Sequence, residues 1–190
     1  MFNQLFEYAA PDYFPREKIW RKREKSLANP AKILGLISDT HGLLREEAVR
    51  ALRGSDLILH AGDVGAPQIL DALKTIAPVV AVRGNVDTDK WGQTLPLVEV
   101  IQAGSTMIYM LHILQDLDIN PVAGGFQIVV SGHSHKPGQT EKDGVLYINP
   151  GSAGPRRFYL PVTVARLNLE VRPWKVEFID LEGSKSVEGS

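Results

Sequence analysis

Residues 33–41 read Ile-Leu-Gly-Leu-Ile-Ser-Asp-Thr-His, an apolar run that ends in a carboxylate and an imidazole. A short apolar run of this kind is typical of a buried β-strand. In open α/β sheets, ligands bind beyond the carboxyl ends of the strands. Asp39 and His41 are therefore predicted to lie at a ligand-binding edge.

The same pattern recurs four times further along the chain. In each case an apolar run is followed by polar donors: 57–59 by His60 and Asp63, 79–82 by Asn85 and Asp87, 106–111 by His112, and 128–130 by His133 and His135. Seven donors stand out: Asp39, His41, Asp63, Asn85, His112, His133 and His135. One catalytic ion takes about three protein ligands and keeps a place for water. Seven donors therefore suit two ions that share one carboxylate, as in two-metal phosphoester hydrolases.

These motifs carry a family resemblance. Asp39-x-His41, Gly62-Asp63, Gly84-Asn85-x-Asp87, His112 and Gly132-His133-x-His135 resemble, in order and spacing, the motifs of the calcineurin-like metallophosphoesterases. The run Asn149-Pro150-Gly151-Ser152 narrows the resemblance to the small single-domain bacterial and archaeal phosphodiesterase branch, to which the retromer metallophosphoesterase-like subunit is related in fold. The resemblance covers about residues 32–180 and implies an α/β fold, a four-layer α/β/β/α sandwich with two mixed β-sheets.

The resemblance also implies a role for each donor. Asp39, His41 and His135 would hold the first ion, Asn85, His112 and His133 the second, and Asp63 would bridge both. Small phosphodiesters or phosphomonoesters would be hydrolysed by a metal-bridging hydroxide, with Asp63, Asn85 and Asp87 as the catalytic residues. The alternative is a non-catalytic protein-interaction scaffold of the same fold, but a scaffold is free to lose ligands and this chain keeps all seven.

The donor types narrow the choice of metal. Oxygen and imidazole donors without sulfur suit manganese, zinc, iron, nickel or cobalt, and we expect two divalent ions, with manganese the first choice. Two positions depart from the family pattern. Val86 stands where larger relatives carry a histidine that can protonate the leaving group, and Ile113 follows His112 where relatives commonly show His-Gly-His. Substrates with good leaving groups are therefore expected.

Other polar residues allow two interpretations each. His60 is either a histidine satisfied within the core or a residue that orients a metal ligand from behind. Asp87 either accepts a hydrogen bond from a ligand imidazole or from substrate, or holds a turn. Arg83, Arg156 and Arg157 either contact the phosphate of the substrate or form surface ion pairs.

Composition limits the class of protein. The 190 residues suit one domain with a sizeable core, and 44% hydrophobic and 23% charged residues are ordinary for a soluble protein. The 21 basic and 22 acidic residues nearly cancel, so nucleic acid and membrane are not expected partners. The expected partner is a small phosphoester substrate, and a homo-oligomer is compatible with the sequence. The absence of cysteine, of a secretory signal and of a membrane-spanning run favours a cytoplasmic location.

The chain divides into three parts. Residues 1–31 form an N-terminal extension in which Pro15 and the spacing of the apolar residues after it predict one short amphipathic helix, ending at Asn29-Pro30. Residues 32–182 form the metallophosphoesterase domain, and residues 183–190 a flexible tail. Strands are predicted at 32–38, 56–61, 79–83, 97–102, 106–111, 127–131, 145–149, 163–168 and 174–179, and helices at 45–53 and 67–76. Residues 115–126 are predicted to form one more helix or an ordered loop.

Overall fold

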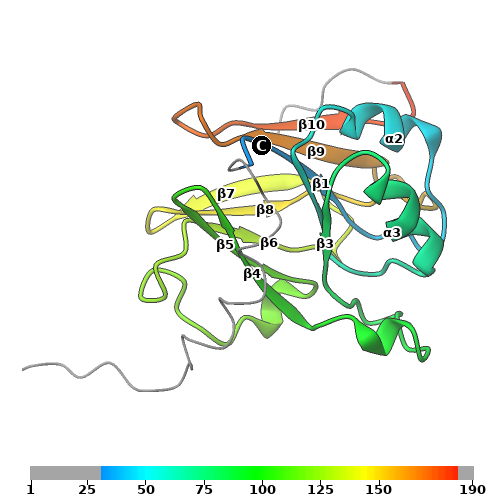
Figure 1. Cartoon of the computed structure of the whole chain (residues 1–190), viewed down its shortest axis with the longest axis horizontal. Helices are drawn as coiled ribbons and strands as arrows, with labels where there is room; N and C mark the ends of the chain where they lie inside the picture. The colour runs from blue at the N-terminus through cyan, green and yellow to red at the C-terminus, as the bar shows by residue number, and fades with distance from the viewer. Residues whose placement is uncertain (1–30, 184–190) are drawn as a thin grey trace, which may run out of the picture. The chain divides into compact units, whose positions relative to one another are not determined.

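The computed structural model of the chain describes residues 31–183. They form two five-stranded β-sheets, with two α-helices beside the first sheet (Figure 1). No helix within these residues is long and apolar enough to cross a membrane. The amphipathic helix predicted between Pro15 and Pro30 and the tail predicted after residue 183 lie outside the described residues, so the proposed division of the chain remains a prediction.

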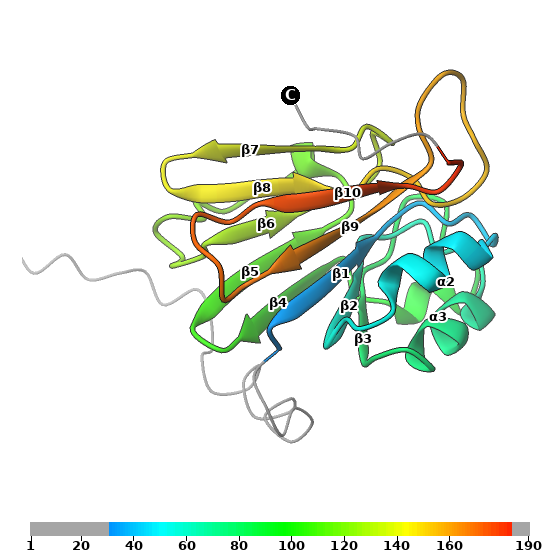
Figure 2. The same cartoon turned by 90° about the horizontal axis from the view of Figure 1, so that it is seen from above.

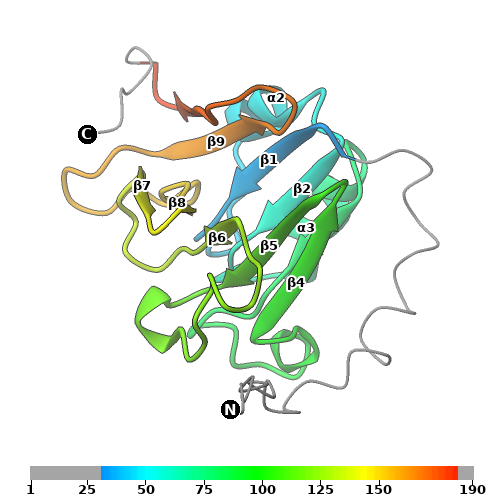
Figure 3. The same cartoon turned by 90° about the vertical axis from the view of Figure 1, so that its left-hand side faces the viewer.

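The first sheet has the strand order β10-β9-β1-β2-β3. The strands β1, β2 and β3 are parallel to one another, β9 pairs antiparallel with β1, and the edge strand β10 pairs antiparallel with β9 (Figure 3). The parallel strands read as continuous apolar runs because both of their faces are covered. The bounds are β1 Ile33–Ile37, β2 Leu57–His60, β3 Val79–Ala81, β9 Thr163–Asn168 and β10 Val176–Asp180.

Two helices connect the parallel strands. The helix α2 (Glu46–Leu52) joins β1 to β2, and α3 (Pro67–Lys74) joins β2 to β3. Proline is tolerated at the start of α3 because the first N–H groups of a helix have no partner within the helix. Both helices turn their apolar side chains, such as Leu52 and Leu73, into one core cluster with Ile58 of β2.

The second sheet has the order β4-β5-β6-β8-β7. A hairpin joins β4 (Val98–Ala103) to β5 (Thr106–Leu111), and β5, β6 (Ile128–Val130) and β8 (Val145–Asn149) are parallel. The edge strand β7 (Gly138–Lys142) was not predicted. Its sequence, Gly-Gln-Thr-Glu-Lys, carries no apolar alternation, because it forms an exposed edge that contributes nothing to the core.

The main core lies between the two sheets. Leu34 and Leu59 of the first sheet and Ile108, Met110 and Ile128 of the second are fully buried in one cluster. Burying apolar surface stabilises a protein by about 25 cal/mol per Å². This cluster is therefore the principal source of stability.

The predicted sandwich of two mixed sheets is confirmed, and the predicted elements lie within two residues of the observed ones. Among residues 31–183, the layer outside the second sheet is a loop and contains no α-helix. There the outer face of the second sheet packs Tyr109 and Val129 against Leu117 and Phe126. These last two belong to an ordered loop with a single 3-10 turn, η2 (Leu114–Asp116), rather than to an α-helix. A second 3-10 turn, η1 (Gly92–Thr94), follows β3.

Candidate metal centre

The ends of five parallel strands bring all seven predicted donors to one edge of the sandwich. From the first sheet, β1 leads into Asp39 and His41, β2 into Asp63 and β3 into Asn85. From the second sheet, β5 leads directly into His112, and β6 leads into the turn that carries His133 and His135. Because parallel strands end at the same edge, residues up to 96 positions apart in the sequence meet here.

Three of the donors form a compact group, which we call the buried half. The Nε2 atom of His135 lies 3.1 Å from Oδ1 of Asp39. The Nε2 atom of His41 lies 3.4 Å from Nε2 of His135 and 3.9 Å from Oδ1 of Asp39. Asp39 and His135 are buried and His41 is half-buried. One cation could contact all three side chains.

Three further donors form a second group, which we call the open half. Oδ1 of Asn85 lies 3.1 Å from Nε2 of His112 and 2.9 Å from Nδ1 of His133. Asn85 and His133 are exposed, whereas His112 is buried. The Nδ1 atom of His112 is 2.7 Å from the carbonyl oxygen of Ala61, which can only accept a hydrogen bond. In the neutral ring this contact leaves Nε2 of His112 as the nitrogen available to a metal ion.

Asp63 lies between the two halves. Its Oδ2 atom is 3.3 Å from Nε2 of His112 in the open half and 4.0 Å from Nε2 of His41 in the buried half. Its Oδ1 atom accepts a hydrogen bond of 3.0 Å from the backbone N–H of Val86. A fixed carboxylate that faces both groups is the arrangement that a shared ligand requires.

The backbone at the donors is strained. Five of the seven have positive φ angles: Asp39 54°, His41 47°, Asp63 53°, His133 68° and His135 58°. Such residues cost about 1–3 kcal/mol each and gather at functional sites. Asp39 and His41 therefore do not converge from an extended segment. They converge from a left-handed turn whose N–H groups donate to the carbonyls of Gly62 and Asp63.

The residues present fit a cation. Oδ1 of Asp39 and Nδ1 of His135 are buried and have no hydrogen-bond partner among residues 31–183. Leaving a buried carboxylate oxygen without a donor is costly, and a positive ion beside it would remove that cost. The carboxylate, amide and imidazole donors are also the usual non-sulfur ligands of divalent transition metals.

The electrostatics favour the ligand forms of Asp39, His41 and Asp63 and oppose that of His112. Burial alone would raise the pKa of the Asp63 carboxyl, but the His112 imidazole and the Val86 N–H hold it below its ordinary value. The same balance holds for Asp39, where burial would raise the pKa but His135, Ser38 and His112 together lower it. Burial lowers the pKa of His41, which favours its neutral, metal-binding form. For His112, burial is outweighed by Asp63, so its pKa is raised and protons compete for Nε2.

Two glycines are required because the donors pack directly against them. A Cβ atom at Gly84 would overlap the side chain and backbone of Asp63, and one at Gly132 would overlap Ser38 and approach Asp39 Oδ2. Neither glycine has a positive φ angle. Close approach, rather than the backbone freedom that sharp turns usually need, is therefore the reason for glycine at both positions.

Asp87 holds a turn. Its two oxygens accept hydrogen bonds from the backbone N–H groups of Val64 (3.1 Å), Gly65 (2.8 Å) and Gly84 (2.9 Å). These bonds join the turn after β2 to the turn after β3. The three accepted hydrogen bonds match the turn interpretation of Asp87, which also lines the pocket beside Asn85 and His112. Its expected catalytic role remains a prediction.

His60 lies behind the centre. It is fully buried, and its Nε2 lies 2.9 Å from Oγ1 of Thr40, whose hydroxyl donates to the carbonyl oxygen of Val64. Since the Thr40 proton is used, Nε2–H of His60 must be the donor, which fixes the tautomer. Burial lowers the pKa of His60 to about 4. The hydrogen bond of His60 goes to Thr40 and not to one of the seven predicted donors. The structure therefore matches a histidine satisfied within the core, and the orienting role remains a prediction.

The motif at 149–152 braces the donor turns from the second sheet. Nδ2 of Asn149 donates to the carbonyl oxygen of Gly132 (2.6 Å) and to Oγ of Ser134 (3.0 Å). Oγ of Ser152 donates to the carbonyl oxygen of Asp39 (3.1 Å). Both turns that carry the buried half are thereby tied to the end of β8.

The three arginines have different surroundings. Nη2 of Arg157 lies 3.4 Å from Nε2 of His41, so this side chain reaches the centre. Arg156 instead pairs with Glu182 at 3.1 Å, the surface ion pair that was the alternative. Arg83 lines a pocket of about 530 Å³ beside the open half, together with Asn85 and His112.

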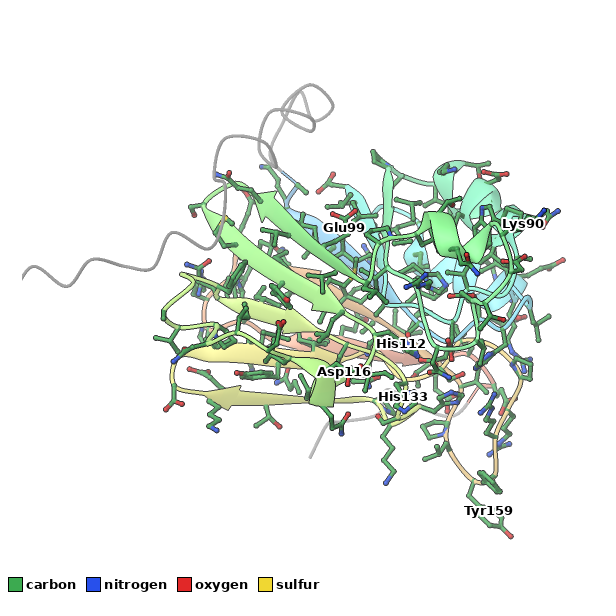
Figure 4. All side chains as sticks on the ribbon, turned by 90° about the horizontal axis from the view of Figure 1, so that it is seen from below. Lys90, Glu99, His112, Asp116, His133 and Tyr159 are labelled. Carbon is green, nitrogen blue, oxygen red and sulfur yellow. The ribbon has the colours of Figure 1, made fainter. Side chains whose placement is uncertain are left out.

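One of the two departures from the family pattern lies in this pocket. Ile113 lines it, together with Asp116, which lies near His112 and His133 in Figure 4. The Val86 side chain is 46% exposed. Sequence reasoning missed Asp116, since an acidic residue in a loop predicts only solvation. It also missed Thr40, whose side chain points away from the centre and acts through His60.

The comparisons with known proteins agree with this geometry. The family model described as "Calcineurin-like phosphoesterase superfamily domain" matches residues 33–172. A probable metallophosphoesterase of Methanothermobacter thermautotrophicus is 34% identical over 151 residues, which cover 73% of this chain and 87% of the relative.

Solved structures share the fold. A predicted phosphoesterase from Streptococcus pneumoniae has a TM-score of 0.66 and 26% identity, covering 83% of this chain and 94% of its own. Vacuolar Protein Sorting 29 from Cryptosporidium parvum has a TM-score of 0.69 and 23% identity, covering 84% and 96%. The second likeness, at its low identity, is one of fold alone.

Proposed function

Since the chain belongs to the calcineurin-like phosphoesterase superfamily and is a metal-dependent phosphoesterase, we propose that it hydrolyses small phosphodiesters or phosphomonoesters with two divalent metal ions. The observation that carries the proposal is the arrangement of the donors in two groups of three, with Oδ2 of Asp63 facing both. The strained backbone at five of these donors supports it, because such strain persists where function requires it.

Each part of the centre has a task in this proposal. Two bound ions would lower the pKa of a water molecule and neutralise charge on the phosphoryl group. Asp39 and Asp63 are the only charged donors among the seven, so two divalent cations outweigh their charge and the centre attracts an anionic ester. The Arg157 guanidinium, already beside His41, is placed to donate to a phosphoryl oxygen.

Manganese is the metal we propose first. The donors are two carboxylates, one amide and four imidazoles, and the whole sequence contains no cysteine. Carboxylate and amide oxygens suit manganese, whereas imidazole also accepts zinc, iron, nickel or cobalt.

We propose further that substrates carry good leaving groups. In the turn after β3, Val86 has no proton to give and Asp87 is turned toward backbone N–H groups. General acid catalysis is worth about 10²–10⁴-fold. Without it, aryl phosphodiesters should react far faster than alkyl ones. A rate series against leaving-group pKa that is flat, with chemistry rate-limiting, would contradict this.

The second candidate is a non-catalytic protein-interaction scaffold. It is supported by the likeness in fold to Vacuolar Protein Sorting 29 from Cryptosporidium parvum. The complete donor set favours the enzyme, because a scaffold has no need of strained ligand turns.

Metal removal and restoration tests the proposal. Chelator-treated protein should lose hydrolysis of bis(p-nitrophenyl) phosphate and recover it with Mn²⁺, with circular dichroism confirming that the chain stays folded. Activity that persists in protein shown to be metal-free would contradict metal dependence. Folded, metal-loaded protein without activity toward any aryl phosphoester would favour the scaffold.

A further inference from the structure

The loop between β8 and β9 carries the two most exposed large apolar side chains of residues 31–183. Phe158 is 89% exposed and Tyr159 is 98% exposed. The loop projects from the edge at which β8 ends (Figure 2), and Tyr159 lies at its tip (Figure 4). Neither ring makes an aromatic contact with the part of the chain that the structure describes. Exposed rings of this size are typical of binding surfaces.

The loop is held in this conformation. The N–H of Leu160 donates to the carbonyl oxygen of Arg157 (3.2 Å), which makes Phe158 and Tyr159 the central residues of a tight turn. Phe158 has a φ of 53°, a rare conformation for a bulky residue. At the base of the loop, Ser152 pairs with Val162, and the N–H of Gly154 donates to the carbonyl oxygen of Asp39. The two rings are therefore presented from a base fixed to the metal centre.

Arg157 connects the rings to that centre. Its guanidinium lies 3.4 Å from Nε2 of His41, while the next residue along the chain, about 3.8 Å away at Cα, is Phe158. A phosphate held by Arg157 and the centre would thus lie at the base of the turn that carries the two rings. A ligand that carries both an anionic phosphoester and a planar ring matches this pairing.

We propose that Phe158 and Tyr159 form a stacking platform for a nucleobase, so that the substrates of the proposed phosphoesterase include nucleotide phosphodiesters. The inference rests on the proposed function for the catalytic step, but nucleotide binding can be measured without it. Aromatic rings next to an arginine are a common way to bind bases without sequence preference. The balanced net charge of the chain fits a small nucleotide better than a long nucleic acid.

The charges around the loop argue against a membrane. Arg156 is paired with Glu182, and Arg157 points inward to His41, so neither is directed toward lipid headgroups. The size of the loop tip argues against a protein partner. Two rings bury at most about 300–500 Å², whereas a stable interface takes about 800 Å² from each partner. One base, or two, fits the surface that is available.

Binding of two matched ligands tests the platform. Adenosine 5′-monophosphate and ribose 5-phosphate carry the same anion and sugar and differ in the base. On Mn²⁺-loaded protein, calorimetry should show tighter binding of the nucleotide. In the Phe158→Ala/Tyr159→Ala double variant, the ratio of the Kd for ribose 5-phosphate to the Kd for the nucleotide should fall about tenfold, the effect typical of removing a stacking partner. Tyr159→Trp should keep it, and Val122→Ala, which alters an exposed residue of another loop, should leave it unchanged.

A kinetic comparison separates this inference from the proposed function. Thymidine 5′-(p-nitrophenyl phosphate) and methyl p-nitrophenyl phosphate release the same leaving group, and the double variant should lower kcat/KM about tenfold only for the thymidine ester. Equal losses for both esters, or an unchanged binding preference, would overturn the platform. Base-dependent binding without hydrolysis of either ester would refute the proposed function alone. Loss of binding to anionic lipid vesicles in the double variant, with nucleotide binding unchanged, would assign the rings to a membrane and overturn the proposal.

Discussion

The buried half and the open half of the centre use similar side chains but satisfy them in different ways. In the open half, Oδ1 of Asn85 already lies within hydrogen-bond distance of His112 and His133. In the buried half, Oδ1 of Asp39 and Nδ1 of His135 have no hydrogen-bond partner in the described part of the chain. The buried half therefore has polar atoms that its own residues do not satisfy and that a cation could contact, whereas Oδ1 of Asn85 in the open half can accept a hydrogen bond from the His133 ring.

Their positions in the fold explain the difference. The buried half lies where the turns after β1 and β6 meet, braced by Asn149 and Ser152. The open half borders the pocket lined by Arg83 and Ile113, where substrate can enter. We infer that the buried half contributes mainly to metal affinity and stability and the open half mainly to contact with substrate.

The largest effect should come from removing the carboxylate that joins the halves. Asp63→Asn withdraws charge from both groups at once, so kcat/KM should fall by more than the ~10–100-fold typical of a supporting residue. Asp87→Asn is the matched control, because the Asp87 carboxylate accepts hydrogen bonds from backbone N–H groups. The fall in kcat/KM for this variant should stay within that range. Steady-state kinetics with metal analysis would decide. If the Asp63 variant kept two ions and normal turnover, Asp63 would not be the bridging ligand.

The next largest loss of activity should come from a substitution that displaces the Asp63 side chain without replacing it. Gly84→Ala places a Cβ atom against Asp63, and a displacement of about 1 Å at a reacting group can cost about 100-fold. Gly138→Ala is the control, because a Cβ atom there has open space. We expect a large loss of kcat for Gly84→Ala and none for Gly138→Ala, with both variants folded. Equal activities would mean that Asp63 tolerates displacement.

A smaller effect should separate the two halves directly. Saturating Mn²⁺ stabilises a protein by about 2.7 kcal/mol at 100 times Kd, and most of this should come from the buried half. His135→Ala should therefore reduce the metal-induced rise in Tm more than His133→Ala does. Thermal unfolding with and without Mn²⁺ measures both. If the His133 variant loses more, the division of roles between the halves is reversed.

The smallest effect concerns His60 behind the centre. Its pKa is lowered from 6.5 to about 4 in the folded chain, so the unfolded chain binds the extra proton as pH falls below about 6.5. The folded state is then disfavoured, by about 2 kcal/mol at pH 5 relative to neutral pH. His60→Gln keeps a donor for Thr40 and removes the titration. Chemical denaturation of both proteins at pH 7 and pH 5 should show a shallower loss for the variant, and parallel losses would contradict the assignment.

Much of the fold and centre could be predicted from the sequence because their signals are local. A parallel strand buried on both faces is a continuous apolar run, and the residue after it is fixed at the sheet edge. Asp39, Asp63 and His133 could therefore be named from their place after β1, β2 and β6. The grouping of the donors was supplied by the family resemblance, and the distances agree with it.

The remaining features depend on contacts between distant segments. The strand β7 is an exposed edge, and its polar sequence predicts no core face. Asp87 stands in a motif with Asn85, yet its bonds to Val64 and Gly65 belong to a turn 23 and 22 residues earlier. The exposure of Phe158 could not be predicted, because an aromatic residue in a loop is expected to pack.

Anomalous diffraction from crystals soaked in Mn²⁺ tests the central claim most directly. We expect two peaks about 3.5–4 Å apart. One should contact Asp39, His41 and His135, the other Asn85, His112 and His133, and both should contact Asp63. A single peak, or a pair that does not share Asp63, would contradict the binuclear centre.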